Sequence, residues 1–270
     1  MKIPIYQIDA FTSQLFGGNP AAVCPLDDWI PEVVMQKISA ENNLSETAFI
    51  VPNLAADENS TGVASYSIRW FTPLREIELC GHATLASAYV IFNHLRPEAQ
   101  SIRFSSMSGL LVVVKQDELI TLNFPAIPPE PGELRDDVAM ALGDRPILLF
   151  STKRSMAVFE HQSQIERLKP DFAKLMAIPD VSGIIVTAPG EDSDFVSRFF
   201  IPKYGINEDP VTGSAHCTLI PYWATRLGKT KLFARQLSAR GGELWCEHAG
   251  ERVKMSGHAV EYLRGEIEVI

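Results

Sequence analysis

Hydrophobic and polar residues alternate along this chain with two periods, one typical of strands and one typical of helices. The period of two predicts strands in the first half at residues 3–11, 47–51, 66–71, 101–106, 110–116 and 119–124. In the second half it predicts strands near 146–151, 155–160, 183–187, 195–201 and from Gly242 to Ile270. The helical period predicts helices over 31–42, 81–94, 134–142 and 164–176, and one that begins at Ser214. Strands outnumber helices and many can pair with a neighbour in sequence, which favours an α+β fold.

A proline-rich segment lies near the middle of the chain, with the sequence Phe-Pro-Ala-Ile-Pro-Pro-Glu-Pro-Gly over residues 124–132. Four prolines so close together cannot belong to a helix or to a central strand. The apolar Ile267 and Val269 at the far end of the chain need a partner strand, so the last strand is expected to return to the first half. We therefore expect two domains, one of residues 1–118 with 257–270 and one of residues 119–256.

An internal repeat relates the two halves. Arg69-Trp-Phe-Thr-Pro73 precedes Gly81-His-Ala at the start of one predicted helix, and Arg198-Phe-Phe-Ile-Pro202 precedes Gly213-Ser-Ala at the start of another. Repeats of this length indicate a duplicated structural unit. We expect two similar halves related by a pseudo-two-fold axis, each contributing a strand, a loop and a glycine-led helix to a shared cleft.

The two glycine-led helices offer a place for an anion. The first N–H groups of a helix have no intrahelical partner, and the helix dipole adds positive charge there. Glycine lets a ligand approach the backbone, so Gly81 and Gly213 are candidate binding residues for a substrate carboxylate. A single glycine at such a place commonly does no more than relieve a tight turn.

Composition and charge exclude several classes of protein. The 270 residues are 46% hydrophobic and 21% charged, which is typical of a globular protein. The 24 basic and 33 acidic residues give a formal net charge of −9, which disfavours binding to nucleic acid or to an anionic membrane surface. No stretch approaches the ~20 apolar residues of a membrane span. The four cysteines form no C-x-x-C pair, so we expect free thiols and a cytoplasmic protein.

Three ionisable residues near the glycine-led helices are candidates for proton transfer. Glu46 opens an apolar strand, where a carboxylate is either a solvated edge residue or a general base. His82 follows Gly81, and near a helix N-terminus an imidazole is expected in its neutral form, which suits a proton relay. Asp209 precedes a proline, a place where aspartate also opens ordinary turns.

Together, these segments resemble the PhzF-like family, named for the isomerase of phenazine biosynthesis. The matching segments are Asp9-Ala-Phe-Thr, Phe16-Gly-Gly-Asn-Pro20, Leu44-Ser-Glu-Thr-Ala-Phe49, Phe71-Thr-Pro73, Cys80-Gly-His-Ala-Thr84 and Glu208-Asp-Pro-Val-Thr-Gly-Ser-Ala215. They follow the family's order from the N-terminus to about residue 220. The resemblance implies a diaminopimelate-epimerase-like fold, in which each half is a curled sheet around a central helix and the active site lies between the halves.

The same resemblance implies an isomerase that works without metal or organic cofactor on a small carboxylated substrate. It assigns catalytic acid–base chemistry to Glu46, assisted by His82 and Asp209. Substrate binding is assigned to Asn19, Gly81, Gly213 and Ser214. A homodimer is the expected assembly.

Two alternatives remain open at this stage. Related epimerases use two thiols, each before the glycine of one of these helices, and this chain has Cys80 in the first place but Thr212 in the second. A threonine hydroxyl is too weak an acid to replace a thiolate, so a two-thiol racemase is disfavoured, although Cys80 could act with Asp209. The second alternative is a binding or regulatory protein that keeps the fold. The six histidines show no metal-ligand spacing, which predicts no metal.

Overall fold

The computed structural model describes residues 1–53, 62–151 and 155–269. These residues divide into two compact units: unit 1 comprises Met1–Phe124 and Lys254–Ile270, and unit 2 comprises Pro125–Val253. The first boundary follows Phe124 rather than residue 118, because β8 (Leu119–Pro125) pairs antiparallel with β7 (Gly109–Gln116) and so continues the unit 1 sheet. The return to unit 1 falls within β17 (Arg252–Gly257), which pairs with β8.

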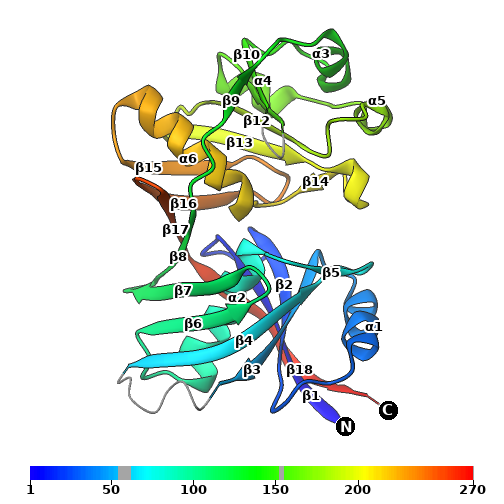
Figure 1. Ribbon diagram of the computed structural model, residues 1–270, viewed down its shortest axis with the longest axis vertical. Helices are drawn as coiled ribbons and strands as arrows, with labels where there is room; N and C mark the ends of the chain where they lie inside the picture. The colour runs from blue at the N-terminus through cyan, green and yellow to red at the C-terminus, as the bar shows by residue number, and fades with distance from the viewer. Residues whose placement is uncertain (54–61, 152–154, 270) are drawn as a thin grey trace. The chain divides into compact units, whose positions relative to one another are not determined.

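Unit 1 is built on one sheet (Figure 1). In the order of their pairing, its strands are β18 (Ala259–Glu268), β1 (Lys2–Ala10), β2 (Asn19–Pro25), β3 (Glu46–Pro52), β4 (Val63–Phe71), β6 (Ser101–Ser106), β7 and β8. The pairs β2–β3 and β4–β6 are parallel and the others are antiparallel. A two-residue strand, β5 (Glu76–Ile77), pairs with the end of β4. The last strand of the chain thus pairs with the first.

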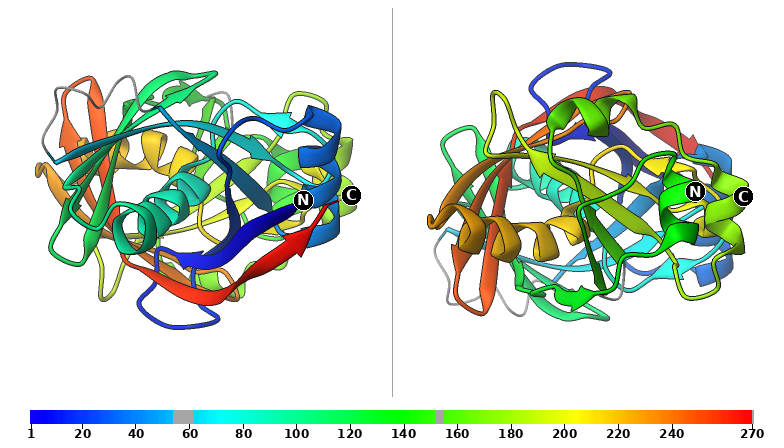
Figure 2. Two further views of the ribbon diagram at one scale, coloured as in Figure 1. Left: turned by 90° about the horizontal axis from the view of Figure 1, so that it is seen from below. Right: turned by 90° about the horizontal axis from the view of Figure 1, so that it is seen from above.

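Two helices pack on this sheet. Helix α2 (Gly81–Val90) is buried at all but one of its positions, and Figures 1 and 2 show it within the curl of the unit 1 strands. It continues into a π-helical turn at Ile91–Leu95. Helix α1 (Glu32–Asn42) covers the other face of β1 to β4, where Met35 and Ile38 pack with Phe49 and Phe71. A helix that is buried on nearly every side, as α2 is, belongs to the core of its unit.

Unit 2 repeats the pairing pattern of unit 1. In pairing order, its strands are β9 (Glu130–Gly132), β10 (Leu148–Ser151), β11 (Ser155–Val158), β12 (Ile184–Pro189), β13 (Phe195–Phe200), β15 (Lys231–Gln236) and β16 (Gly242–Ala249). The pairs β11–β12 and β13–β15 are parallel, as β2–β3 and β4–β6 are in unit 1. A two-residue strand, β14 (Glu208–Asp209), pairs with β13, as β5 does with β4. The internal repeat predicted from sequence is confirmed.

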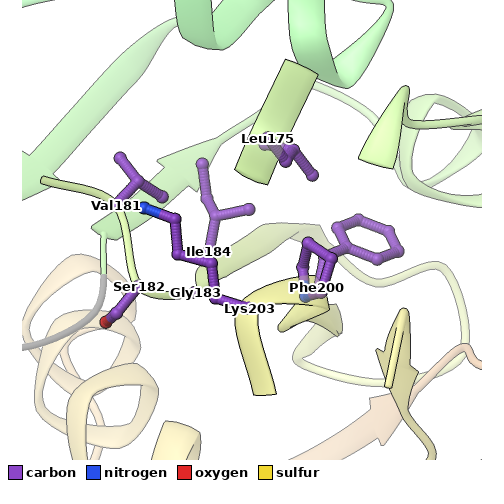
Figure 3. Close-up of a pocket in the computed structure, with 8 residues that line it drawn as sticks. Leu175, Val181, Ser182, Gly183, Ile184, Phe200 and Lys203 are labelled. Carbon is purple, nitrogen blue, oxygen red and sulfur yellow. The ribbon is translucent and has the colours of Figure 1, made fainter. Parts of the chain in front are cut away.

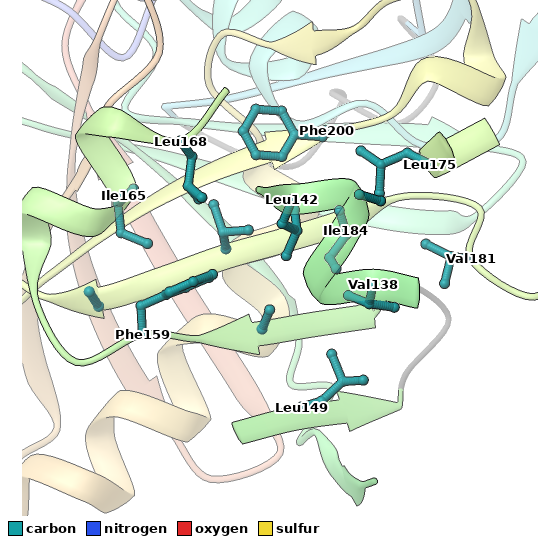
Figure 4. Close-up of a cluster of buried hydrophobic side chains, with 14 of the residues drawn as sticks. Val138, Leu142, Leu149, Phe159, Ile165, Leu168, Leu175, Val181, Ile184 and Phe200 are labelled. Carbon is teal, nitrogen blue, oxygen red and sulfur yellow. The ribbon is translucent and has the colours of Figure 1, made fainter. Parts of the chain in front are cut away.

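Helices cover both faces of the unit 2 sheet. The helices α3 (Asp136–Leu142), α4 (Gln162–Arg167) and α5 (Phe172–Ala177) form one buried apolar cluster with the sheet (Figure 4). On the other face, Phe195 stacks on Trp223 of α6 (Gly213–Leu227) with ring centroids 5.7 Å apart. Successive strand residues point to opposite faces, so Phe195 contacts α6 while Val196 enters the cluster.

The single helix predicted over 164–176 is wrong, because the segment forms α4 and α5 with a break between them. Pro170 lies in this break. Proline has no N–H for the helix ladder and restricts the residue before it to extended backbone, so the first helix ends at Arg167. The second starts anew with Asp171, whose side chain accepts a hydrogen bond from the Lys174 N–H at 3.1 Å.

Helix α6 continues through an internal proline. Pro221 cannot donate to the carbonyl of Cys217 one turn earlier, and the N–H of Ile127, in the proline-rich segment, donates to that carbonyl at 2.9 Å instead. The helix ends at Gly228, which adopts a left-handed conformation with φ of 66°. Within the described ranges, no helix has both the length and the apolar composition needed to cross a membrane.

Candidate active site

The topology of unit 1 brings together four of the predicted site residues. Asn19 opens β2 and Glu46 opens β3, and these two strands are parallel and adjacent. Adjacent parallel strands run in the same direction, so their first residues, and with them these two side chains, lie at the same end of the sheet. Helix α2 starts there with Gly81 and His82. We call this group, with Cys80, the unit 1 cluster.

The imidazole of His82 is the centre of the unit 1 cluster. Its Nε2 lies 3.1 Å from Glu46 Oε2, and its Nδ1 lies 3.1 Å from the Asn19 side-chain nitrogen and 3.5 Å from Cys80 Sγ. The His82 side chain is 4% exposed and that of Glu46 is 16% exposed. The carboxylate is therefore the member of the pair that a ligand could reach directly.

The groups around His82 act on its pKa in opposite directions. Burial lowers the pKa of His82, whereas the neighbouring Cys80 and Glu46 raise it, and the net direction is well above the usual value. The Glu46 carboxylate is the closer of the two, with Oε2 3.1 Å from Nε2. The neutral imidazole expected at the helix N-terminus stays a prediction, because the Asn19 side-chain nitrogen, 3.1 Å from Nδ1, is a donor that a neutral ring accepts. The Asn19 amide can turn a donor or an acceptor to Nδ1, so it accommodates both protonation states.

The Cys80 thiol is not activated in this environment. Cys80 is buried, and burial raises the pKa of its thiol; the Glu46 carboxylate raises that pKa further, while His82 lowers it in part. The net direction is upward, so the sulfur is a neutral thiol at neutral pH. Because the thiolate is the reactive form of cysteine, this site lacks the electrostatics of a catalytic thiol.

Glu46, Cys80 and His82 are also a group of potential metal ligands, whose donor atoms lie within 4.8 Å of one another. The imidazole, however, presents Nδ1 to the sulfur and Nε2 to the carboxylate. A metal ion takes one nitrogen of a given imidazole, and the two nitrogens point in nearly opposite directions. The three groups would have to rearrange before they could coordinate one ion, so this geometry fits proton transfer better than metal binding.

The other predicted site residues lie together in unit 2. Asp209 is in β14, is 8% exposed, and accepts a hydrogen bond at 2.6 Å from the hydroxyl of Thr212. Gly213 and Ser214 form the start of α6. The side chain of Gln236, at the end of β15, contacts Asp209 and Thr212 through three hydrogen bonds. We call Asp209, Thr212, Gly213, Ser214 and Gln236 the unit 2 cluster.

The arginines of the repeat brace the segment before each glycine-led helix. Arg69 makes two hydrogen bonds of 2.6 Å to the carboxylate of Glu76 in β5, and Arg198 makes two of 2.8 Å to that of Glu208 in β14. Each pair closes the short hairpin between a long strand and its two-residue partner. Because Asp209 follows Glu208, the second pair fixes the backbone that carries this site residue.

A hollow elsewhere in unit 2 has none of these features. Figure 3 shows that it is lined mainly by apolar side chains, among them Leu175, Ile184 and Phe200. Its one charged lining residue, Lys203, donates hydrogen bonds to the carbonyls of Ile178 and Pro179. No predicted site residue lines it, and we assign it no role.

Sequence analysis identified the ionisable members of both clusters but missed Gln236. Glu46, His82 and Asn19 come together in unit 1, and Asp209, Gly213 and Ser214 in unit 2. Gln236 reaches its partners through the parallel pairing of β15 with β13, and no local sequence pattern predicts this pairing. The strand that carries it, β15, was not predicted either.

Comparison with known proteins agrees with this geometry. Residues 8–265 match the PhzC-PhzF family, described as phenazine biosynthesis-like protein. An uncharacterized isomerase of Pseudomonas aeruginosa is 48% identical over 270 residues, which cover 100% of both chains. The crystal structure of a PhzF family protein of Enterococcus faecalis has a TM-score of 0.93 and 46% identity, again over 100% of both chains.

More distant structures define the fold. A hydroxyproline epimerase from Agrobacterium vitis shares it with a TM-score of 0.61 at 11% identity, over 98% of this chain and 91% of that one. The fold is therefore the diaminopimelate-epimerase-like fold, and the family relationship supports an activity of the isomerase or epimerase type. The chain belongs to the PhzC-PhzF family of phenazine biosynthesis-like proteins.

Proposed function

We propose that the protein is an isomerase that moves a proton between two carbons of a small carboxylated metabolite, without metal or organic cofactor. The observation that carries the proposal is the pair of Glu46 and His82, whose Oε2 and Nε2 lie 3.1 Å apart at the start of α2. The ionised carboxylate is the form that can accept a proton, and His82 lies close enough to donate a hydrogen bond to it. The 16% exposure of the Glu46 side chain leaves it within reach of a ligand.

In this proposal Glu46 serves first as base and then as acid. Its carboxylate removes a proton from carbon, and the carboxylic acid so formed returns a proton to another carbon on the same face of the substrate. The C–H bond breaks and the electron pair shifts into the substrate's π system; the new C–H bond then uses that pair. A single acid–base group of this kind performs an isomerisation, whereas inversion of a stereocentre needs two groups on opposite faces.

The chemistry of a carboxylate limits the substrate class. A carboxylate is a weak base, so it removes protons only from carbon that an adjacent double bond or carbonyl makes acidic. The N-terminus of α2 at Gly81 and that of α6 at Gly213 are each the kind of place that suits a substrate carboxylate. Ser214 adds a hydroxyl for binding, and Asn19 holds Nδ1 of His82. Asp209 is proposed to assist proton transfer.

The thiol-assisted epimerase has one observation in its favour, the 3.5 Å distance between Cys80 Sγ and His82 Nδ1. Imidazole beside a thiol is an arrangement that often activates cysteine. Here burial and the Glu46 carboxylate raise the pKa of Cys80, which opposes thiolate formation. The carboxylate mechanism is therefore the one that we propose.

The test is a panel of small β,γ-unsaturated, α,β-unsaturated and α-substituted carboxylates incubated with the protein in D₂O and followed by NMR. We expect at least one to change the position of its double bond or carbonyl, with deuterium only at the carbon that gains a proton. Inversion at the α-carbon with no positional change would indicate the epimerase instead. Panel members that bind, as judged by thermal stabilisation, but neither isomerise nor exchange would indicate a binding protein.

A further inference from the structure

The Asp209 carboxylate is supported by a neighbour that occupies the place of a catalytic thiol in related epimerases. Thr212 is the residue before the glycine of α6, and its Oγ1 donates to Asp209 Oδ2 at 2.6 Å. Both side chains are buried, with exposures of 4% and 8%. A buried carboxylate needs hydrogen-bond donors to remain ionised, so this contact bears directly on the charge of Asp209.

Gln236 fixes the direction of that hydrogen bond. The Thr212 N–H donates to Gln236 Oε1 at 2.9 Å, which orients the amide, because only the oxygen can accept there. The amide nitrogen then donates to the Asp209 carbonyl oxygen at 2.8 Å and to Thr212 Oγ1 at 3.2 Å. The hydroxyl has a single proton, and since it receives a hydrogen bond from Gln236 its own proton points to Asp209.

Unit 1 lacks this arrangement. The residue before Gly81 is Cys80, whose sulfur lies 3.5 Å from His82 Nδ1. In the pairing register, Gln236 lies opposite Ser197, the residue before Arg198. The register of β4 with β6, which pairs Ser67 with Ser105, places Ser106 opposite the residue before Arg69, and the Ser106 hydroxyl donates to the Gly109 carbonyl. Among the described residues, the contacts of Gln236 are therefore not repeated at the equivalent position of unit 1.

We propose that Thr212 and Gln236 are positioning residues that hold the Asp209 side chain ionised and in one orientation, the amide acting on the carboxylate through the threonine hydroxyl. The proposal rests on the proposed function in so far as Asp209 assists proton transfer. It gives Thr212 a role that an ionised thiol could not fill, since the hydroxyl stays protonated and donates to Asp209 while it accepts from Gln236.

The first test does not depend on turnover. In the full chain labelled with ¹³C-aspartate at pH 7, the Asp209 carboxyl resonance is assigned by its absence from Asp209→Asn. We expect Thr212→Val, which keeps the shape but removes the hydroxyl, to displace this resonance, and Thr212→Ser to leave it in place. Gln236→Met, which removes the amide that orients the Thr212 hydroxyl, should also displace this resonance. An unchanged resonance in Thr212→Val and Gln236→Met would overturn the proposal.

The second test measures turnover of the panel carboxylate that the wild type isomerises. We expect Thr212→Val to lower kcat at least tenfold with little change in KM, roughly the effect of one charge-assisted hydrogen bond, and Thr212→Ser to recover most of the loss. Equal kcat in Thr212→Val and Thr212→Ser would overturn the proposal. If the wild type isomerises no panel member, the proposed function fails, while the carboxyl resonance still decides whether Thr212 and Gln236 hold Asp209.

Thr187 supplies a matched control in the same unit. It is fully buried, and its hydroxyl donates to the Val196 carbonyl at 2.7 Å and accepts from Trp223 Nε1 at 2.9 Å. Thr187→Val therefore removes a buried threonine hydroxyl that makes one donor and one acceptor contact, as the Thr212 hydroxyl does. We expect it to lower the thermal unfolding midpoint as Thr212→Val does, while leaving both the Asp209 resonance and kcat unchanged. A change in both would show that the Thr212→Val effects are general destabilisation.

Discussion

Nε2 of His82 lies 3.1 Å from Oε2 of Glu46, and this contact ties the first turn of α2 to the first residue of β3. The pair combines a nearly inaccessible imidazole with a carboxylate that a ligand can reach. Such an arrangement suits a carboxyl group that gains and loses a proton during each turnover. The imidazole can compensate the charge of the ionised form, and the protonated form has no charge to compensate.

The first prediction concerns the thiol. Cys80→Ala should keep turnover within about threefold of the wild type, because a thiol whose pKa is raised supplies no nucleophile or base at neutral pH. Kinetics with the panel carboxylate test this. Cys24→Ala, another buried cysteine of unit 1, is the control for lost packing. Abolished turnover in a folded Cys80→Ala protein, with Cys24→Ala active, would establish the thiol-based epimerase instead.

The second prediction concerns metal ions. Dialysis of the protein against EDTA should leave the isomerisation rate unchanged, because His82 turns different nitrogens to Cys80 and Glu46 and the three groups do not converge on one position. The rate is measured before dialysis, after dialysis, and after addition of one equivalent of zinc. A loss on dialysis that zinc restores would contradict the cofactor-free mechanism.

The third prediction is a pH dependence of stability that arises from His216. Burial lowers the pKa of His216 to about 4 from the usual 6.5, and its Nδ1 donates to the Thr212 carbonyl at 2.8 Å. The unfolded chain therefore binds the proton more readily, so this contribution to stability is complete above pH 6.5 and is lost as the pH falls toward 4. The full loss corresponds to roughly 3 kcal/mol.

Urea unfolding at pH 7, 5 and 4 measures this contribution. His216→Asn is the comparison, since its amide can still donate to the Thr212 carbonyl but does not titrate. The wild type should lose more unfolding free energy than His216→Asn over this range. Parallel pH profiles for the two proteins would show that His216 is not the group responsible.

The fourth prediction compares the two arginine pairs of the repeat. Glu208→Gln should lower the free energy of unfolding by roughly 2 kcal/mol, because Arg198 is only 13% exposed and keeps a charge without a carboxylate. Glu76→Gln should cost roughly half as much, because Arg69 is 25% exposed and retains Glu32 at 2.7 Å. Denaturant unfolding of both variants tests the order, and a greater loss in Glu76→Gln would contradict it.

Many elements of the fold could be predicted from local sequence patterns. The helices near 31–42 and 81–94 and most strands of the first half follow from periodicity, and the repeat of Arg69 and Arg198 revealed the duplication. Strand β2 (Asn19–Pro25) was not predicted, because its first two residues belong to a Gly-Gly-Asn-Pro segment, a composition typical of a turn. Its parallel pairing with β3 is a contact between distant segments, which periodicity does not encode.

The candidate site divides in the same way. Glu46, His82 and Asp209 could be selected from residue type and their position beside the glycine-led helices. The 3.1 Å contact between His82 and Glu46 could not be predicted, because the two residues lie on different elements. Gln236 lay beyond prediction for the same reason, since only strand pairing brings it to Thr212.

The most direct measurement follows isomerised and deuterated ligand in D₂O at saturating concentration, with wild type and Glu46→Gln. The amide keeps the shape of the side chain but cannot accept the proton, so the rate should fall by about 10⁴-fold, while binding changes little. Glu261→Gln is the matched control, because Glu261 also pairs with a histidine of unit 1, His94, at 2.6 Å. It should react at the wild-type rate. Equal rates in Glu46→Gln and the wild type would contradict the assignment of Glu46 as the group that moves the proton.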